Sequence, residues 1–220
     1  REINNLDEAE IVYRQAIAIK PDYAEAHSNL GIILQGLCNF EEAEIVQRHL
    51  ISLDPNFIKA HYNLGNTFKE LGRLEEAEVS FKQAISLEPD YAESHYNLGN
   101  TLQELGRLED AEVSFKQAIT LNPDYSAAFN NLGVTLQELG RSEESEESYR
   151  KAIALQSDYA VAHNNMGLTQ QELGQFEDAE ASYRKAFTLN PKYTDAFFNL
   201  GLLLYESKQY EKAIEQFKLS

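Results

Sequence analysis

Histidine side chains recur at a fixed interval in this sequence, and histidine is a frequent ligand of protein-bound metal ions. Four of the five histidines are separated by 34 residues or by twice that number: His27, His61, His95 and His163. Ligands of one zinc ion must lie about 2 Å from it, whereas equivalent residues on neighbouring packed helices are held apart by interaxial distances of about 8–10 Å. The same position holds Phe129 and Phe197 in two other intervals. We therefore interpret it as an aromatic packing position and predict no metal site.

Adjacent carboxylates are the second candidate for chemistry. Glu75 and Glu76 form one pair, and Glu143 and Glu144 form another. A general acid–base pair requires a pocket and a carboxyl group with a raised pKa, whereas carboxylates at the start of a helix complement the helix dipole and face water. The sequence also lacks a phosphate-binding glycine loop followed by lysine, a zinc-protease helix motif and a nucleophile elbow. We predict that the protein is not an enzyme and has no cofactor.

Acidic residues dominate the charge of the chain. Asp and Glu number 36 against 19 Lys and Arg, which gives a formal net charge of -17. A field of this sign repels the phosphates of nucleic acids and the surfaces of anionic membranes, so we predict neither as a partner. A basic or neutral polypeptide is the better candidate.

Cys38 is the single cysteine, so no disulfide can form within the chain, and we expect its side chain to be at least partly buried. No apolar run approaches the ~20 residues that a membrane-spanning helix needs. The sequence does not determine the compartment, and a cytoplasmic location is favoured. Because the chain opens inside a pattern already under way, we expect it to be a fragment.

A period of 34 residues organises the whole chain, and self-similarity at a fixed interval indicates a repeat architecture. Glycines follow this period at Gly31, Gly65, Gly99, Gly133, Gly167 and Gly201. All five prolines fall at one other phase of it, namely Pro21, Pro55, Pro89, Pro123 and Pro191. We predict a single domain over 1–220 with full repeats at 24–57, 58–91, 92–125, 126–159 and 160–193, preceded by a half-repeat at 1–23 and followed by an incomplete repeat at 194–220.

Each repeat contains two predicted helices. In the third full repeat the first runs roughly over 90–104 and the second over about 108–121, with apolar residues at helical spacing. Gly106 supplies the left-handed residue that ends the first helix, and Pro123 is expected in the first turn of the following helix. Gly99 is expected where the two helices approach closely. A lone hairpin buries only one face, so stability comes from stacking on the next hairpin.

The third full repeat reads His95-x-x-Leu98-Gly99-x-x-Leu102, followed by Ala111, Phe115, Ala118 and Pro123. This pattern resembles the tetratricopeptide repeat, a helix–turn–helix unit of 34 residues, and the resemblance covers essentially the whole chain. It implies an all-α fold, a right-handed α-solenoid of stacked antiparallel helix hairpins. It also implies that the first helix of each hairpin lines the concave side.

Several residues depart from this pattern. Gln47 and Leu50 replace an aromatic and a small residue, Ser145 replaces an alanine, and Gln170 occupies an apolar position. Cys38 and Lys208 stand where other repeats have the glycine between their helices. We expect the repeats concerned to pack less regularly.

One position of the first helix is asparagine in every repeat. We call these residues the asparagine row: Asn29, Asn63, Asn97, Asn131, Asn165 and Asn199. A primary amide offers two donors and one carbonyl acceptor, so it can pair with the N–H and C=O of an extended backbone. The row is similar to that in the repeat superhelix of O-linked N-acetylglucosamine transferases, which bind substrate backbones in this way. The alternative is that each amide bonds to a neighbouring helix.

A second row is glutamate, and we call it the glutamate row: Glu70, Glu104, Glu138, Glu172 and Glu206. These residues lie near the C-terminal ends of the first helices, where the dipole favours cations. The row therefore points to a basic partner, with an ordinary solvated surface as the alternative.

The predicted groove changes character along the chain. In two early repeats, polar and aromatic residues flank the asparagine row: Tyr62, Tyr96, Asn66 and Asn100. In later repeats the residues around it are apolar: Val134, Leu168, Leu202, Val161 and Phe198. Such residues are suited to anchor a ligand, or alternatively pack on an adjacent helix.

The predicted function is a scaffold for protein–protein interaction, which binds an extended basic or neutral polypeptide in its concave groove. Two alternatives stay open. The chain could be the substrate-recruiting arm of a larger enzyme such as a glycosyltransferase. It could also be a self-assembling module that forms a homo-oligomer through its uncapped ends, where Ile214 and Phe217 have no covering helix.

Overall fold

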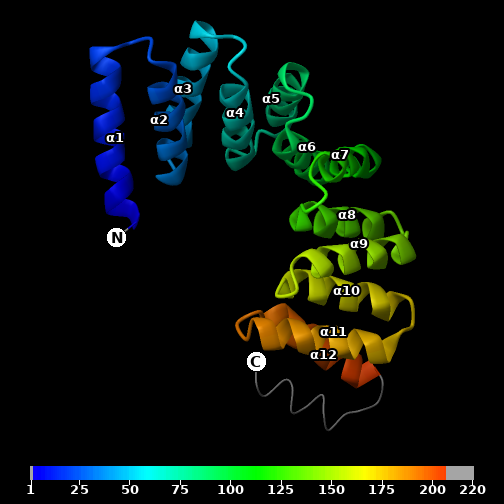
Figure 1. Ribbon diagram of the computed structural model, residues 1–220. Helices are drawn as coiled ribbons and strands as arrows, with labels where there is room; N and C mark the ends of the chain where they lie inside the picture. Colours follow the sequence, from blue (N-terminus) through cyan, green and yellow to red (C-terminus); the bar gives the residue numbers. More distant parts are fainter. Residues whose placement is uncertain (1, 207–220) are drawn as a thin grey trace. The chain divides into compact units, whose positions relative to one another are not determined.

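The computed structural model describes residues 2–206, with side chains from residue 5 to residue 205, and this part of the chain is all α-helical. The first helices of the hairpins are α2 (Ala24–Gly36), α4 (Ile58–Glu70), α6 (Ala92–Glu104), α8 (Ser126–Glu138), α10 (Ala160–Glu172) and α12 (Thr194–Glu206). The second helices are α3 (Phe40–Leu53), α5 (Leu74–Leu87), α7 (Leu108–Leu121), α9 (Ser142–Leu155) and α11 (Phe176–Leu189), and α1 (Glu2–Ile19) precedes them as the second helix of the half-repeat. The predicted all-α fold of stacked antiparallel hairpins is confirmed (Figure 1).

The chain divides into two compact units, Arg1–Arg107 and Leu108–Ser220. The first unit holds α1 to α6 and the second holds α7 to α12, so the division falls between the two helices of the predicted repeat 92–125. The expectations for Lys208, Ile214 and Phe217, and for the side chain of Glu206, lie outside the described residues.

Left-handed residues end the first helices as the glycines predict. Gly72, Gly106, Gly140 and Gly174 have φ between 70° and 74°. After α4, the N–H of Arg73 bonds to the carbonyl of Phe68 at 2.8 Å, which is the bond that closes a Schellman motif. Cys38 takes the same conformation with φ 58°, but its side chain is exposed, so the prediction that it is at least partly buried was wrong. The residue serves the turn and not the core.

The prolines lie in turns between hairpins. Pro123 is the second residue of a four-residue turn that the N–H of Tyr125 closes on the carbonyl of Asn122 at 3.2 Å. Helix α8 begins only at Ser126, so the prediction that Pro123 stands in its first turn was wrong. The ring fixes φ near the value that this turn position requires.

Close approach within a hairpin depends on the periodic glycine and the aromatic residue 16 positions later. A Cβ atom built on Gly133 would lie 2.6 Å from the ring of Tyr149, and one on Gly167 would lie 2.7 Å from the ring of Tyr183. Both tyrosines are fully buried. The first hairpin differs because Gln47 replaces the aromatic ring and lies 3.1 Å from a Cβ built on Gly31. Its Nε2 atom is buried without a hydrogen-bond partner, as the irregular packing expected there suggests.

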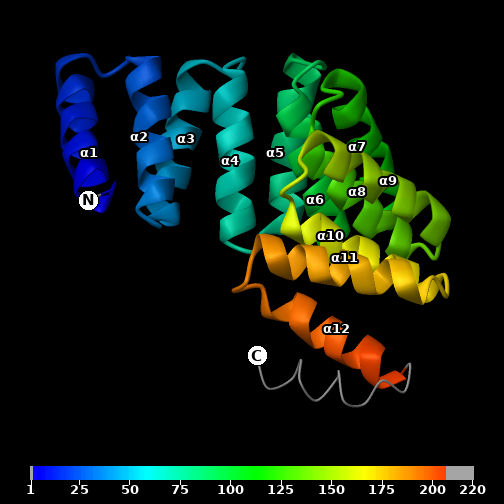
Figure 2. The same ribbon diagram turned by 60° about the horizontal axis from the view of Figure 1, so that its bottom comes forward.

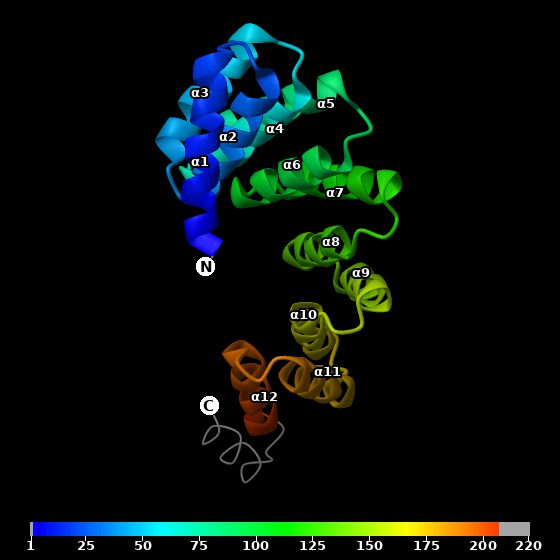
Figure 3. The same ribbon diagram turned by 60° about the vertical axis from the view of Figure 1, so that its left-hand side comes forward.

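Within each unit the two kinds of helix lie on different sides. Neighbouring first helices approach one another closely, as α2 does with α4 and α10 with α12, whereas no such approach occurs between neighbouring second helices of residues 2–206. We therefore call the first helices inner and the second helices outer. Figure 2 shows α1 to α5 side by side, and Figure 3 shows inner helices α8 and α10 on one side of outer helices α9 and α11.

Ion pairs join consecutive outer helices through the turn that precedes each. Arg73 Nη1 lies 2.6 Å from Glu44 Oε2, Arg107 Nη1 lies 2.8 Å from Glu78 Oε2, and Arg141 Nη1 lies 2.7 Å from Glu112 Oε2. The three glutamate side chains are only 13% to 17% exposed. Consecutive hairpins are thus held by charge as well as by the apolar core. No helix in the described part of the chain has the length and apolar character to cross a membrane.

Candidate functional site

The inner helices of the first unit carry Asn29, Asn63 and Asn97 at equivalent positions. The Nδ2 atom of Asn97 donates to the hydroxyl of Tyr62 at 3.0 Å and to Oδ1 of Asn66 at 3.0 Å, which links α6 to α4. Asn63 is buried, with 6% of its surface exposed. These contacts explain why the position favours a primary amide, whose donors reach the preceding inner helix.

The inner helices of the second unit repeat this arrangement with a different acceptor. The Nδ2 atom of Asn165 donates to Oδ1 of Asn130 at 3.3 Å, and that of Asn199 donates to Oδ1 of Asn164 at 3.0 Å. Oδ1 of Asn131 accepts from Nδ2 of Asn130 at 2.9 Å. The alternative that the amides bond to a neighbouring helix therefore holds for the donors of Asn97, Asn165 and Asn199.

Part of the row keeps unused hydrogen-bonding capacity. Within the described residues, Oδ1 of Asn97 and Oδ1 of Asn199 accept no hydrogen bond. Both side chains are partly exposed. A carbonyl oxygen in this position can accept from an N–H group of a ligand.

A hollow on the inner side of the second unit gathers four of the predicted site residues. It measures about 360 Å³ and is lined by Leu168, Glu172, Asn199, Leu202, Gln171 and Phe176. Leu168 also packs against the core cluster around Tyr183, so it is anchored in the hairpin stack. Apolar walls with a carboxylate and an amide at the edge suit an apolar side chain whose neighbours are polar or cationic.

Exposed apolar residues surround this hollow. Phe198 is 57% exposed, Val161 39% and Leu202 38%. Val134 is half-buried on α8. The alternative that these residues only pack on an adjacent helix is therefore incomplete, because much of their surface faces solvent.

The inner side of the first unit has a different surface. Tyr62, Tyr96, Asn66 and Asn100 are all partly exposed there. The ring of Tyr62 lies 5.0 Å from the ring of Tyr91, and its hydroxyl accepts from Asn97. Burial raises the pKa of the Tyr91 hydroxyl to about 12, so this hydroxyl stays protonated at neutral pH. The surface is polar and aromatic.

The glutamate row is exposed at Glu70, Glu104, Glu138 and Glu172. Two of these carboxylates have partners on the adjacent repeat. Lys69 Nζ lies 2.9 Å from Glu104 Oε1, and Gln137 Nε2 donates to Glu172 Oε1 at 2.6 Å. Glu172 also accepts from the Ser142 hydroxyl at 3.1 Å. The row is therefore held in place by its neighbours, and its charge remains at the edge of the inner face.

The periodic histidines have a structural role that the sequence analysis missed. Each ring Nε2 bonds to the carbonyl oxygen six residues earlier, at 2.8 Å from His27 to Pro21, 2.9 Å from His61 to Pro55, 2.9 Å from His95 to Pro89 and 3.2 Å from His163 to Ser157. Burial lowers the pKa of His163, which keeps its ring neutral. A fixed offset of six residues from histidine to the turn was the signal available in the sequence.

The adjacent carboxylates are held as anions by arginine. Arg73 donates to Glu76 at 2.5 and 2.6 Å, and Arg141 donates to Glu144 at 2.7 and 2.6 Å. These hydrogen bonds lower the pKa of both glutamates. A general acid needs the opposite shift, so the geometry favours a role in the helix starts.

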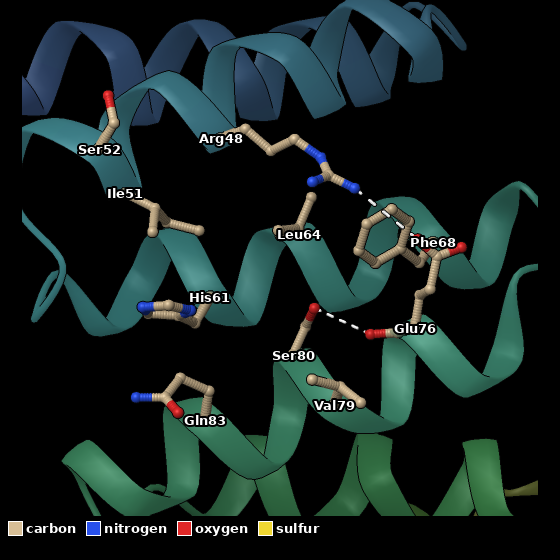
Figure 4. A pocket seen from close by; sticks show the side chains of 10 residues that line it. All are labelled: Arg48, Ile51, Ser52, His61, Leu64, Phe68, Glu76, Val79, Ser80 and Gln83. Atoms are coloured by element: carbon tan, nitrogen blue, oxygen red, sulfur yellow. Dashed lines mark hydrogen bonds and ion pairs between the residues drawn. The ribbon is translucent and has the colours of Figure 1, made fainter.

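A second hollow lies on the outer side of the first unit, where the sequence analysis named no site. It measures about 580 Å³ between α3 and α5, with α4 as its floor (Figure 4). Leu64, Phe68 and His61 form the floor, Ile51 and Arg48 line one wall, and Val79 lines the other. The available signal was the exposed apolar residue at one position of each outer helix, which an amphipathic pattern would make polar.

Family models of the tetratricopeptide repeat match this chain almost throughout. They match residues 1–37 and 65–106, 24–57, 47–79, 92–125, 124–192 and 170–219. Together these segments cover residues 1–219. Comparison with curated proteins found no match of significance.

Several solved structures share the fold. YrrB, described as a TPR protein with an unusual peptide-binding site, is 22% identical with a TM-score of 0.69 over 84% of this chain and 96% of its own. MamA is 25% identical with a TM-score of 0.70 over 75% of this chain and 96% of its own. PilW, described as a type IV pilus biogenesis factor, is 21% identical with a TM-score of 0.80 over 88% of this chain and 90% of its own.

Proposed function

The chain belongs to the tetratricopeptide-repeat family, and on this premise we propose that it is a scaffold for protein–protein interaction that holds an extended segment of another polypeptide on its inner helices. YrrB, which shares the fold, is described as having a peptide-binding site. A stack of hairpins offers such a segment one equivalent set of side chains per repeat.

The observation that carries this proposal is the apolar hollow of the second unit. Leu202 and Phe198 expose 38% and 57% of their surfaces beside a hollow of about 360 Å³. Exposed large apolar residues around a concavity are typical of interaction sites, because covering them removes apolar surface from water. At ~25 cal/mol per Å² of apolar area, one buried leucine or phenylalanine side chain of a ligand contributes about 1.5–3 kcal/mol.

The asparagine row supports an extended backbone as ligand, in a narrower role than the sequence suggested. Because their Nδ2 donors already bond to the preceding repeat, Asn97 and Asn199 have mainly Oδ1 to offer. A carbonyl oxygen on each inner helix would accept N–H groups of a peptide laid across the helices. Each neutral bond contributes only ~0.5–1.5 kcal/mol, so the row fixes the path of the ligand while the apolar contacts supply most of the affinity.

The charge of the inner edge favours lysine or arginine in the ligand. Glu138 and Glu172 are exposed next to the inner face of the second unit, and the whole chain carries a net charge of -17. Such a field raises the association rate of cationic ligands and repels acidic ones. The proposed ligand is therefore an extended segment with an apolar residue flanked by basic residues.

The proposal is tested with capped synthetic peptides that contain one leucine between two lysines in a glycine–serine background. Calorimetry with the 220-residue chain should give a dissociation constant in the micromolar range, about -8 kcal/mol. Replacing the leucine of the peptide by glycine, or Leu202 by Asn, should weaken binding about tenfold. Leu202→Asn places in α12 the residue type that Asn66 and Asn100 have at the equivalent position in the first unit.

The matched control is Val113→Asn. Val113 is 68% exposed on the outer helix α7 of the same unit, so this change alters an exposed apolar residue away from the inner face. Binding should stay within twofold of the unchanged chain. If no lysine–leucine peptide binds below about a millimolar dissociation constant, or if both variants weaken binding equally, the proposed site is wrong.

A further inference from the structure

The outer helices of the first unit share a pattern of three exposed residues. Along α5, Glu75 is followed by Val79 four residues later and by Lys82 three residues after that, so the three lie on one helix face. Along α3 the same positions hold Glu41, Ile45 and Arg48, and along α1 they hold Asp7, Ile11 and Arg14. Across the three helices these residues make an acidic row, an apolar row and a basic row.

The apolar row is more exposed than core packing explains. Ile11 is 57% exposed, Ile45 67% and Val79 68%. β-Branched side chains on the solvent face of a helix also have lower helix propensity than the charged residues usual there. Three such residues in one row form a continuous surface feature, and isolated exposed apolar residues do not.

A hollow lies beside each step of the apolar row, at the same place in successive repeats. The hollow of about 580 Å³ between α3 and α5 is lined by Arg48, Ile51, His61 and Leu64. The preceding hollow, of about 330 Å³ between α1 and α3, is lined by the residues 34 positions earlier, Arg14, Ile17, His27 and Leu30. The hollows exist because neighbouring outer helices of this unit do not approach one another closely.

We propose that the outer face of α3 and α5 binds a second copy of this chain. A two-fold axis in the interface, directed along the apolar row, turns the second copy so that apolar row meets apolar row. The same rotation places the acidic row of each copy opposite the basic row of the other. The hollow beside Val79 then gives room to apolar side chains of the facing copy (Figure 4).

Charge is the reason to choose a second copy as the occupant. A chain with net charge -17 repels itself over most of its surface, so self-association requires a face on which both signs are present and ordered. Arg48 and Lys82 are each 56% exposed, and Glu41 and Glu75 are exposed at the other end of the same helices. A purely basic partner would match the acidic row and face repulsion from the basic row.

The second unit interrupts the pattern on two of its outer helices. Helix α7 has Glu109, Val113 and Lys116, but α9 has Glu147 in the apolar position and α11 has Ala181. Glu147 is 66% exposed and lies 3.0 Å from Lys151, so a glutamate is compatible with this position of an outer helix. The substitution that disrupts the proposed interface therefore already occurs within the chain.

Sedimentation over a range of concentrations of the 220-residue chain gives the first test. The unchanged chain should show a reversible monomer–dimer equilibrium. Val79→Glu and Ile45→Glu should each raise the dimer dissociation constant at least about tenfold. Ile19→Glu is the matched control, because Ile19 is 86% exposed on α1 outside the three rows, and it should change the constant less than twofold.

Charge reversal gives the second test. One variant combines Glu41→Lys with Glu75→Lys, and the other combines Arg48→Glu with Lys82→Glu. Each variant alone should be monomeric because like charges then face each other, whereas an equimolar mixture should form a heterodimer. Circular dichroism confirms that each variant is helical, and Val79→Glu provides the independent disruption if a reversed variant unfolds.

A chain that stays monomeric up to about millimolar concentration overturns the proposal. A dimer that Val79→Glu and Ile45→Glu leave intact also overturns it, because the contact then lies elsewhere. The result is independent of the proposed function, since Val79→Glu should leave affinity for the lysine–leucine peptide unchanged.

Discussion

The two units of the molecule are built from the same repeat and present opposite surfaces. On the inner side, the first unit is polar and aromatic around Tyr62 and Asn66, whereas the second is apolar around Leu168, Leu202 and Phe198. On the outer side the order reverses. The first unit exposes Ile45 and Val79, whereas α9 and α11 of the second have Glu147 and Ala181 at the equivalent positions.

This difference teaches that the hairpin fold leaves its two solvent-facing surfaces free to vary. The positions that hold the stack together are similar in both units. Ala77 and Ala179 are fully buried, and the close glycine–aromatic contact occurs at Gly65 with Phe81 and at Gly167 with Tyr183. Surface positions carry no such packing constraint, so each unit can acquire its own binding face.

The largest expected effect concerns the close contact inside a hairpin. Gly167→Ala would place a Cβ atom 2.7 Å from the buried ring of Tyr183, and overpacking of this kind destabilises by about 1–3 kcal/mol. Gly31→Ala in the first unit should have a smaller effect, because its nearest neighbour is the flexible side chain of Gln47 at 3.1 Å. Urea unfolding followed by circular dichroism measures both. Equal losses of stability would show that the aromatic ring is not the constraint.

The next effect concerns the inner faces. Asn66→Leu gives the first unit the residue type that Leu168 and Leu202 supply in the second. Combined with Leu202→Asn, it should restore part of the lost affinity for the lysine–leucine peptide, by roughly 1 kcal/mol. Calorimetry on the single and double variants makes the measurement. A double variant that binds no better than Leu202→Asn alone would mean that the contrast between the faces does not lie in these residues.

A third effect concerns the ion pairs between hairpins. The hydrogen bond from Lys82, with that from Arg107, lowers the pKa of Glu78 against the opposing effect of burial. Because the folded-state pKa lies below the ordinary glutamate value of ~4.3, its stabilisation is present above that value and is lost as pH falls through the folded-state pKa. Glu78→Gln should therefore cost about 1 kcal/mol at pH 7 and progressively less below pH ~4. Unfolding midpoints as a function of pH measure the change.

Glu75→Gln is the control for this third prediction. Glu75 is exposed on the same helix, so its replacement should change the midpoint by less than about 0.5 kcal/mol. If Glu78→Gln behaves like Glu75→Gln at every pH, the ion pairs with Arg107 and Lys82 do not join the hairpins energetically.

The smallest effect concerns the first hairpin turn. Cys38 has the left-handed conformation that Gly72 has in the next hairpin, with φ 58° against 70°. Cys38→Gly removes a backbone penalty of about 1 kcal/mol and adds unfolded-chain entropy of slightly smaller size, so it should stabilise by about 0.5 kcal/mol. Gly72→Ala should destabilise, which provides the opposite control. Thermal unfolding of both variants measures the pair, and a stabilising Gly72→Ala would contradict the account.

Much of the fold could be predicted from the sequence because the repeat states its structure six times over. The helix bounds predicted for the third full repeat, about 108–121 for the second helix, match α7 (Leu108–Leu121). Pro123 was placed wrongly by three residues, since a proline suits the second position of a turn as well as the first turn of a helix. Nothing in the local sequence distinguishes the two before the closing bond to Asn122 is seen.

The candidate site could be predicted less completely. The position of Asn199 beside Leu202 and Leu168 follows from helical spacing, and the structure brings all three to one hollow. The donor bond from Asn199 to Asn164 depends on the distance between two inner helices, which no pattern within one repeat contains. The outer hollow was missed for the same reason, because it depends on the separation of α3 and α5.

The most direct test of the account is a methyl NMR titration of the 220-residue chain, in which leucine, valine and isoleucine methyl groups report on both faces at once. Adding the lysine–leucine peptide should shift the methyl signals of Leu168 and Leu202 and leave those of Ile45 and Val79 in place. Raising the protein concentration without peptide should do the reverse. Peptide-induced shifts at Ile45 and Val79, or none at Leu202 at saturating peptide, would contradict the division of the molecule into an inner binding face and a separate outer face.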